Sequence, residues 1–313
     1  MQQKLLTPEQ IAAQAQTAIP NLRLPQRSSV FADRAARLRY LAAAHPMAGY
    51  LEFCALLADA QQSLLRDAVL GPLTAPVNLL QPIVHGLPPL DFQNHTRSAQ
   101  WRYGLRRLLH SLTERTSGRQ YEVASALERQ SEEFYEAQAS KLLAGVRSGL
   151  DVASAPFIGA ALQAYFTHLV IELGGQAFPR TNIATLCPCC GSRPTASVVR
   201  IGGTEDGYRF LHCALCNAQW HMVRIKCSNC ESTRGISYQR LDDGSPAQTR
   251  AVAAEVCEEC GTYLKICYMD RDPLVEPVAD DLASLPLDLL VASTGKSCSG
   301  VNFLLIHGES ESA

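Results

Sequence analysis

The chain has 313 residues, of which 47% are hydrophobic and 19% are charged. This composition is typical of a globular protein with a sizeable core and excludes a disordered chain. The net charge of −2 is unevenly spread: residues 1–180 carry 17 Lys and Arg against 14 Asp and Glu, whereas residues 181–313 carry 11 against 16. Because a nucleic-acid-binding module normally offers a basic face to phosphates, the acidic second part argues against nucleic acid as a partner.

The N-terminal residues do not resemble a targeting segment. Residues 1–20 lack the basic start and the continuous apolar stretch of a secretory signal. Nowhere do about 18 uncharged apolar residues follow one another, so no membrane span is expected. We therefore expect a cytoplasmic protein, in whose reducing surroundings clustered thiols more often bind metal than form disulfides.

The first 180 residues are predicted to be helical. The run Thr7-Pro8-Glu9-Gln10 has the pattern of a capping box and opens a first helix. A second helix is expected to begin at Ser28 or Ser29, and a third at Pro46. Apolar residues at three- and four-residue spacing mark the second, third and fourth helices: Phe31, Ala35, Leu38 and Leu41; Tyr50, Phe53, Cys54 and Leu57; Trp101, Leu105, Leu108, Leu109 and Leu112.

Two longer helices complete this part. A fifth helix is predicted over residues 121–147 and a sixth over residues 156–173, where Gly174-Gly175 ends it. The segment 71–89 is rich in Pro and Gly and is expected to be mostly irregular.

Beyond these glycines the pattern changes from helix to strand. Residues 196–201 and 208–211 are predicted to be strands on either side of a Gly-Gly turn. A second hairpin is expected from residues 236–238 and 251–253, with its turn at residues 242–244. The tail contains an expected helix over residues 280–289, followed by an irregular end.

Eight of the twelve cysteines form four Cys-x-x-Cys pairs. Two residues between thiols let a tight turn direct both sulfurs at one point, about 2.3 Å from a zinc ion. Since two such turns complete a tetrahedron, four turns predict two metal ions per chain. Taken in chain order, the pairs give two candidate sites: Cys187, Cys190, Cys213 and Cys216; Cys227, Cys230, Cys257 and Cys260.

The chemistry of such sites is restricted. Four thiolates suit Zn²⁺ or a single iron, and the ligand type alone does not separate them. With every position occupied by protein there is no room for a reactive water, so each site is expected to be structural or electron-transferring and not hydrolytic. Gly191, Asn217 and Gly261 each follow a cysteine pair and are expected to adopt the left-handed conformation that directs backbone N–H groups at sulfur. The order of pair, hairpin and pair occurs twice, an internal repeat of about 40 residues.

The remaining cysteines are not expected to bind metal. Cys189 adjoins Cys190 and is interpreted as a spare thiol. Cys54 lies on an apolar helix face and is interpreted as a small packed hydrophobe. Cys267 and Cys298 lie beyond the fourth pair.

Two histidines flank the second pair. His212 or His221 could replace a sulfur, but a packing or supporting role is favoured because four cysteines already suffice. Disulfide chemistry by one pair would need a helix N-terminus in a βαβ unit, which the sequence does not predict. No P-loop, dinucleotide-binding glycine cluster or His-Glu-x-x-His occurs, so no enzyme activity is predicted.

Longer motifs surround the cysteines: Cys187-Pro188-x-Cys190-Gly191-Ser192-x-Pro194, Leu211-His212-Cys213-x-x-Cys216, Trp220-His221-x-Val223-Arg224-x-Lys226-Cys227-Ser228-Asn229-Cys230, Cys257-Glu258-Glu259-Cys260-Gly261-Thr262-Tyr263-Leu264-Lys265 and Val278-Ala279-Asp280-Asp281-Leu282-Ala283-Ser284-Leu285. Together they resemble the FdhE family of formate dehydrogenase accessory proteins. The resemblance is specific over residues 187–285 and looser through the helices, for example at Ala155-Pro156-Phe157-Ile158. It therefore covers most of the chain.

The sequence and the resemblance together imply an α+β protein. An all-α helical domain over residues 1–180 would precede two small rubredoxin-like or zinc-ribbon-like Cys₄ modules over residues 181–225 and 226–272, with a C-terminal helix and tail over residues 273–313. The resemblance favours iron at the eight cysteines, and zinc is the alternative. Each module is expected to fold as a unit, so a serine at Cys213 or Cys257 would unfold its own module and leave the N-terminal helices intact.

The resemblance also implies a function. The protein would be a cytoplasmic accessory protein in the maturation of a respiratory formate dehydrogenase, and it would bind the molybdenum- or tungsten-containing catalytic subunit before that subunit leaves by the twin-arginine pathway. The sequence leaves a homodimer open. One alternative is a rubredoxin-like electron-transfer protein, although such a carrier needs little beyond its metal sites and this chain has a large helical part. A zinc-ribbon nucleic-acid-binding protein is the other alternative and is disfavoured by the acidic second part.

Overall fold

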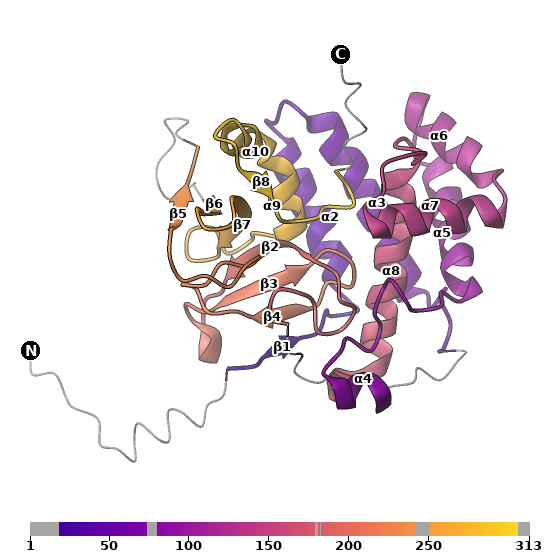
Figure 1. Ribbon diagram of the computed structural model, residues 1–313. Helices are drawn as coiled ribbons and strands as arrows, with labels where there is room; N and C mark the ends of the chain where they lie inside the picture. The colour runs from indigo at the N-terminus through magenta and orange to yellow at the C-terminus, as the bar shows by residue number, and fades with distance from the viewer. Residues whose placement is uncertain (1–18, 74–79, 179–180, 182, 242–250, 306–313) are drawn as a thin grey trace, which may run out of the picture.

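The computed structural model describes residues 19–73, 80–178, 181, 183–241 and 251–305. Helices form the first part and strands most of the second, as expected for the α+β class (Figure 1). The capping-box helix predicted from Thr7 lies outside the described residues. The helices of the first part are α2 (Val30–Ala42), α3 (Ala48–Arg66), α4 (Leu80–His85), α5 (Ala99–Thr113), α6 (Gly118–Glu128), α7 (Glu132–Ala144) and α8 (Ala155–Leu173).

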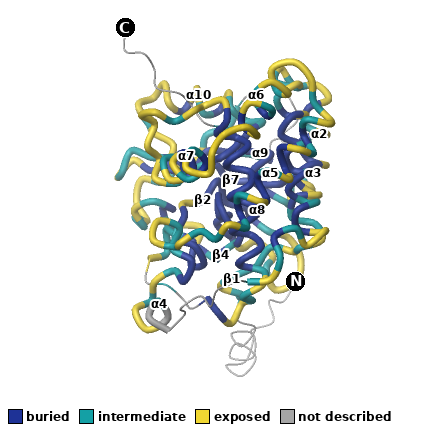
Figure 2. The backbone as a smooth tube through the Cα atoms, turned by 90° about the vertical axis from the view of Figure 1, so that its right-hand side faces the viewer, coloured by how far each residue is buried: buried dark blue, intermediate teal, exposed yellow. Residues whose placement is uncertain are grey.

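Helix α8 lies at the centre of the helical half, by which we mean residues 30–173. Every residue from Ala155 to Val170 is buried, which is the behaviour of a helix that is apolar on all sides. Helices α3, α5 and α7 pack against it, and Figure 2 shows buried backbone concentrated along α8, β7 and α9. The predicted apolar stripes of α2, α3 and α5 all face this core, with only Leu41 and Tyr50 partly buried.

One helix prediction for this part of the chain was wrong. Residues 121–147 do not form one helix, because the chain breaks between α6 and α7. The Ser131 hydroxyl accepts a hydrogen bond from the backbone N–H of Phe134 and so caps a new helix, which ends at the left-handed Gly145. The segment 71–89, expected to be mostly irregular, contains the short helix α4 among its described residues.

The strand-rich half, residues 187–305, is built on one mixed sheet, to which the short strand β1 near the start of the chain adds one edge. The strand order is β1-β4-β3-β2-β7-β6-β5, and β8 pairs with β7. Neighbours are antiparallel except for the parallel pairs β2–β7 and β7–β8. The strands are β1 (Leu22–Arg23), β2 (Pro194–Val199), β3 (Arg209–Cys213), β4 (Gln219–His221), β5 (Ile236–Gln239), β6 (Val252–Cys257), β7 (Thr262–Tyr268) and β8 (Ser297–Cys298).

The two predicted hairpins are present as β2–β3 and β5–β6. In the second hairpin Ile236 pairs with Cys257 and Tyr238 with Glu255, whereas its predicted turn at residues 242–244 lies outside the described residues. Strand β7 was not predicted, and it joins the two hairpins because Ser197 on β2 pairs with Ile266. The sheet therefore crosses the proposed boundary between residues 225 and 226 without a break, and the domain division remains a prediction.

The C-terminal part closes the sheet against the helices. The helix expected over residues 280–289 is two helices, α9 (Pro277–Ala283) and α10 (Leu285–Ala292), since Ser284 ends the first and Pro286 lies in the first turn of the second. The following chain returns to the core, where Val301 hydrogen-bonds to Pro194 and Phe303 packs against Gly159. None of the described helices combines the length and the apolar character needed to cross a membrane.

Candidate metal centres

The eight cysteines of the four pairs converge in two sets of four. We call Cys187, Cys190, Cys213 and Cys216 the first cysteine group, and Cys227, Cys230, Cys257 and Cys260 the second cysteine group; within each group all four sulfurs lie within 4.8 Å of one another. The pairing by chain order that the sequence predicts is therefore the pairing that the fold makes. No disulfide joins any of these cysteines.

The sulfur spacing fits one ion in each group. Four sulfurs at about 2.3 Å from a central ion would lie about 3.8 Å apart. In the first cysteine group Cys187 and Cys216 are 3.5 Å apart and Cys190 and Cys213 are 3.4 Å apart. In the second, the corresponding sulfur–sulfur distances are 3.8 and 3.7 Å. Both groups could hold a tetrahedral ion, and ligation of the ion by these residues remains a prediction.

The local backbone is the same at the first pair of each group. Cys187 donates its N–H to the carbonyl of Ser192, and Cys227 donates to the carbonyl of Ser232. Each of these cysteines in turn accepts a bond from the residue after its pair, Gly191 or Glu231. This repetition confirms the internal repeat in three dimensions.

The second pair of each group lies at a strand end. Cys213 ends β3 and Cys257 ends β6.

Backbone N–H groups donate hydrogen bonds to sulfur in both cysteine groups. The Cys213 sulfur accepts from the N–H groups of Leu215 and Cys216 at 3.4 and 3.3 Å, and the Cys227 sulfur accepts from that of Asn229 at 3.4 Å. Such bonds stabilise thiolate over thiol.

Left-handed residues follow all four pairs. Gly191, Asn217 and Gly261 have φ of +75°, +59° and +68°, as predicted. The fourth is Glu231, with φ of +59°, which the sequence analysis missed because a glutamate rarely adopts this conformation. Its position directly after Cys230 could have predicted the left-handed conformation, because the three other pairs are followed by such a residue.

The first cysteine group cannot carry four charges without a cation. All four of its cysteines are 0% exposed. Burial raises the pKa of the Cys190 and Cys216 thiols well above the ordinary value. Burial also acts to raise the pKa of Cys187, but hydrogen bonds from the neighbouring thiols outweigh burial and hold that pKa well below the ordinary value. Several thiolates in such a place need a bound metal ion to balance their charge.

The second cysteine group has one strongly stabilised thiolate. Burial opposes ionisation of Cys260, but a hydrogen bond between its sulfur and the Thr262 hydroxyl, at 3.1 Å, and another from Asn229 lower the pKa of that thiol to about 6. Burial raises the pKa of Cys227 to about 12. Thr262 and Asn229 were not singled out in the sequence, since neither is a metal-ligand type.

Asn217 joins the first cysteine group to the helical half. Its side-chain oxygen accepts from Arg34 at 2.7 Å, and its amide donates to Thr167 on α8 at 2.8 Å. His212 bonds through Nε2 to the same oxygen and accepts at Nδ1 from Gln219. Burial lowers the pKa of His212 to about 4, so the ring is neutral. His212 therefore supports the site, as predicted, and is not among the grouped ligands.

The other cysteines and His221 lie outside both groups. Cys189 is fully buried beside the first cysteine group but is not one of its four members, and Cys54 is buried within α3, where burial raises its pKa to about 12. Cys267 is buried and Cys298 is exposed. His221 packs edge-on against Tyr208 and Phe210.

Comparison with known proteins identifies the chain's relatives over nearly all of its length. Three family models match in succession: "FdhE, N-terminal" over residues 19–181, "FdhE, central domain" over residues 186–224, and "FdhE, C-terminal domain" over residues 225–305. The eight grouped cysteines fall within the second and third matches.

Individual proteins agree with the family models. The chain is 42% identical to "Protein FdhE homolog" from Cronobacter sakazakii over 295 residues, which cover 94% of this chain and 93% of that protein. It is also 42% identical to "Protein FdhE" from Salmonella paratyphi B, with the same coverage. The crystal structure of the FdhE protein from Pseudomonas aeruginosa superimposes with a TM-score of 0.84 at 38% identity, covering 92% of this chain and 100% of that one.

Proposed function

This chain belongs to the FdhE family, and from that premise we propose that it is an accessory protein in the maturation of a formate dehydrogenase. In this proposal it binds the catalytic subunit of that enzyme in the cytoplasm, before the subunit is exported. It holds one metal ion in each cysteine group, with iron favoured over zinc.

The observation that carries the proposal is the extent of the likeness. Matches run from residue 19 to residue 305 and include both the helical half and the strand-rich half. A shared zinc-ribbon alone would support only a shared metal site. A likeness that includes the helices supports a shared task as well, because a metal site needs no helical half of this size.

The chemistry of the cysteine groups supports an accessory role over catalysis. Four protein sulfurs saturate a tetrahedral ion and leave no position at which formate or water could bind. When bound, the ion supplies cross-linking and charge balance. The residues of the chain position the sulfurs, supply N–H groups to them and, around the first cysteine group, exclude water.

A complementation experiment tests the proposal. Deleting the gene from its host should abolish respiratory formate oxidation and leave synthesis of the catalytic subunit unchanged, and the wild-type gene should restore activity. The variant Cys227→Ser/Cys230→Ser should fail to restore it. The matched control is Cys298→Ser, which removes an exposed cysteine outside both groups and should restore activity fully.

A second experiment measures binding to the catalytic subunit directly. The wild-type protein should retain the catalytic subunit from a cytoplasmic extract of cells blocked in export. Normal formate oxidation in the deletion strain, or full rescue by a folded Cys227→Ser/Cys230→Ser protein that lacks the ion of the second cysteine group, would reject the proposal.

Electron transfer is the second candidate, and one observation favours it. Cys230 is exposed and Cys260 is half-buried, so an ion in the second cysteine group would lie close to the surface, where a redox partner could approach. Protein loaded only with zinc cannot change oxidation state. If zinc-loaded protein still matures the enzyme fully in an extract, the electron-transfer function is excluded.

A further inference from the structure

The two cysteine groups have the same local backbone but differ in their access to solvent. All four cysteines of the first cysteine group are 0% exposed. In the second, Cys227 and Cys257 are buried, Cys260 is half-buried and Cys230 is exposed. The difference therefore arises from what packs on each group and not from the ligand set.

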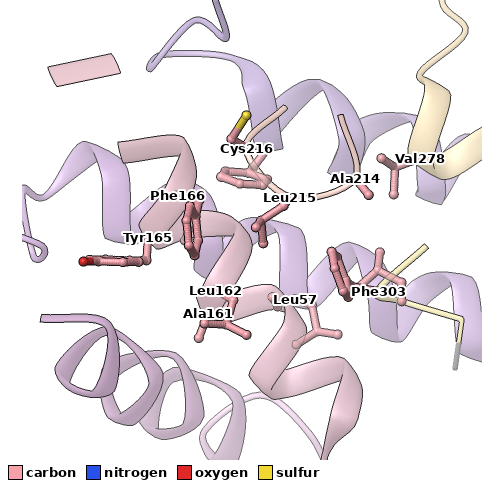
Figure 3. Packing of buried hydrophobic residues seen from close by; sticks show 14 of the residues in the cluster. Leu57, Ala161, Leu162, Tyr165, Phe166, Ala214, Leu215, Cys216, Val278 and Phe303 are labelled. Carbon is pink, nitrogen blue, oxygen red and sulfur yellow. The ribbon is translucent and has the colours of Figure 1, made fainter. Parts of the chain in front are cut away.

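The first cysteine group is covered by the helical half. The N–H groups of Leu90 and Phe92 donate to the carbonyls of Cys189 and Cys190 at 2.9 and 3.0 Å. On the other side, Gln163 of α8 donates to the carbonyl of Ala214 at 2.7 Å. Leu215 and Cys216 belong to the same packed cluster of buried residues as Phe166 of α8 (Figure 3). Exposing these sulfurs would require the main core of the protein to open, which is among the rarest fluctuations of a folded protein.

The second cysteine group is surrounded by strand ends and loops. Arg193 donates to Asn229 at 3.0 Å, and Glu258 donates its N–H to the carbonyl of Gly235 at 2.9 Å. Its ion pairs are Lys296 with Glu258, Arg234 with Glu259 and Lys226 with Glu231. Their carboxylates are at least partly exposed, and pairs of this kind contribute little to stability. Among the described residues, no hydrogen bond or ion pair joins these two cysteine turns to the helical half.

We propose that the second cysteine group is an exchange centre, through which a metal ion enters and leaves the folded protein, while the ion of the first cysteine group is locked in. The inference rests on the proposed function for the presence of one ion in each group. The ligand that drives exchange is a donor supplied from outside that competes with the cysteine sulfurs for the ion, such as a thiolate or a nitrogen-donor chelator. It forms one bond to the ion as the bond to the Cys230 sulfur breaks, and the released thiolate takes a proton from water.

A chelator challenge on the intact full-length protein tests this inference. Native mass spectrometry first counts the ions; fewer than two per chain would contradict the proposed function itself. The protein, in a Cys298→Ser background, is then exposed to the chelator 4-(2-pyridylazo)resorcinol. Cysteines that become free are alkylated with N-ethylmaleimide at successive times and identified by peptide mass spectrometry.

One ion should leave in a fast phase that coincides with alkylation of Cys227, Cys230, Cys257 and Cys260. The other should leave at least about tenfold more slowly, with the first cysteine group unmodified meanwhile. Release of both ions at one rate, or earlier alkylation of the first cysteine group, would overturn the proposal.

A variant keeps the assignment independent of peptide mapping. Cys227→Ser/Cys230→Ser removes two sulfurs of the second cysteine group and none of the first, and should retain one ion that shows the slow phase alone. If the single ion of this variant leaves in the fast phase, the exchangeable ion belongs to the first cysteine group and the proposal fails.

Discussion

The helical half and the strand-rich half are stabilised by different chemistry. The buried polar residues of α3, α7 and α8 are neutral, for example Gln61, Gln163 and Thr167. Among the described residues, every buried charged side chain lies in the strand-rich half or on α2, which faces it: Arg34, Arg37, Arg209, Glu255, Lys265, Glu276, Asp280 and Asp281.

The difference follows from the sizes of the cores. The main apolar cluster includes the helical half and the first cysteine group. The outer sheet, by which we mean β5 and β6 with the β7 residues that pack on them, has only small clusters, such as that of Ala254, Val256 and Tyr263. A small core cannot offset the entropy of folding alone. We infer that the outer sheet depends on its buried ion pairs and on the ion proposed for the second cysteine group, and that the first cysteine group belongs energetically to the helices.

The largest predicted effect concerns the two groups. A structural ion contributes on the order of 10 kcal/mol to folding in zinc-finger peptides. Cys257→Ser should therefore unfold the outer sheet and leave α8 protected in hydrogen exchange followed by mass spectrometry. Cys213→Ser should also reduce protection along α8, because Ala214 and Leu215 belong to the same core. This revises the expectation that each module would unfold alone, and unchanged α8 protection in Cys213→Ser would restore it.

A buried ion pair gives the next largest effect. Arg209 on β3 pairs with Glu255 on β6, and its guanidinium also donates to the carbonyl of Lys226 at 2.7 Å. Removing one partner of a buried pair costs about 3–5 kcal/mol, so Arg209→Met should lower the free energy of unfolding in urea by about this amount.

Two controls define that loss. Arg209→Met/Glu255→Met should recover part of it, because no unpaired charge is then buried. Arg234→Met breaks an exposed pair with Glu259 and should cost at most about 1 kcal/mol. If Arg234→Met costs as much as Arg209→Met, the buried pairs do not distinguish the strand-rich half.

Asn217 tests the connection between the halves. Asn217→Gly keeps the left-handed conformation but leaves Arg34 and His212 without their shared acceptor, and a buried polar group left unsatisfied costs about 1–3 kcal/mol. Asn217→Ala should cost more, because alanine adds backbone strain at this φ. Equal unfolding midpoints for wild type and Asn217→Gly would show that these hydrogen bonds are not important to the contact.

The smallest effect is a pH dependence within the helical half. His168 of α8 donates from Nε2 to the carbonyl of Gly71 at 2.7 Å, and its buried Nδ1 has no hydrogen-bond partner in the part of the chain that the structure describes. Burial lowers the pKa of this ring, against the opposing effect of the Gly71 carbonyl. The unfolded chain therefore binds the proton more readily than the folded one.

The contribution of neutral His168 to the free energy of unfolding is fully present above the ordinary histidine pKa of about 6.5 and decreases as the pH falls below that value. Urea midpoints measured between pH 8 and pH 5.5 should decrease more for wild type than for His168→Gln. Comparing the two proteins removes the contribution of cysteine protonation, which they share. If the urea midpoints of the two proteins decrease equally over this pH range, His168 does not contribute to the pH dependence of stability.

The sequence predicted what is local. Apolar spacing located α2, α3 and α5, and the continuous apolar run that ends at Gly174 located α8. Cysteine spacing alone gave the correct grouping of eight sulfurs. The break between α6 and α7 could have been found from Ser131, which precedes Glu132 and Glu133 as an N-cap should.

Contacts between residues far apart in the chain could not be predicted from the sequence. Strand β7 is central because it pairs in parallel with β2, about 70 residues earlier in the chain, and no local pattern indicates that partner. The unequal burial of the two cysteine groups likewise depends on α8 and on the segment around Leu90, whose contact with Cys189 is a property of the folded chain.

X-ray absorption at the metal edge, combined with metal analysis of the isolated protein, measures the number of bound ions and the atoms that hold them. We expect two ions per chain, each with four sulfur neighbours at about 2.3 Å and no second metal nearby. One ion per chain, nitrogen or oxygen neighbours in place of sulfur, or a short metal–metal distance would contradict the two separate cysteine sites on which both the proposed function and the comparison of the two halves depend.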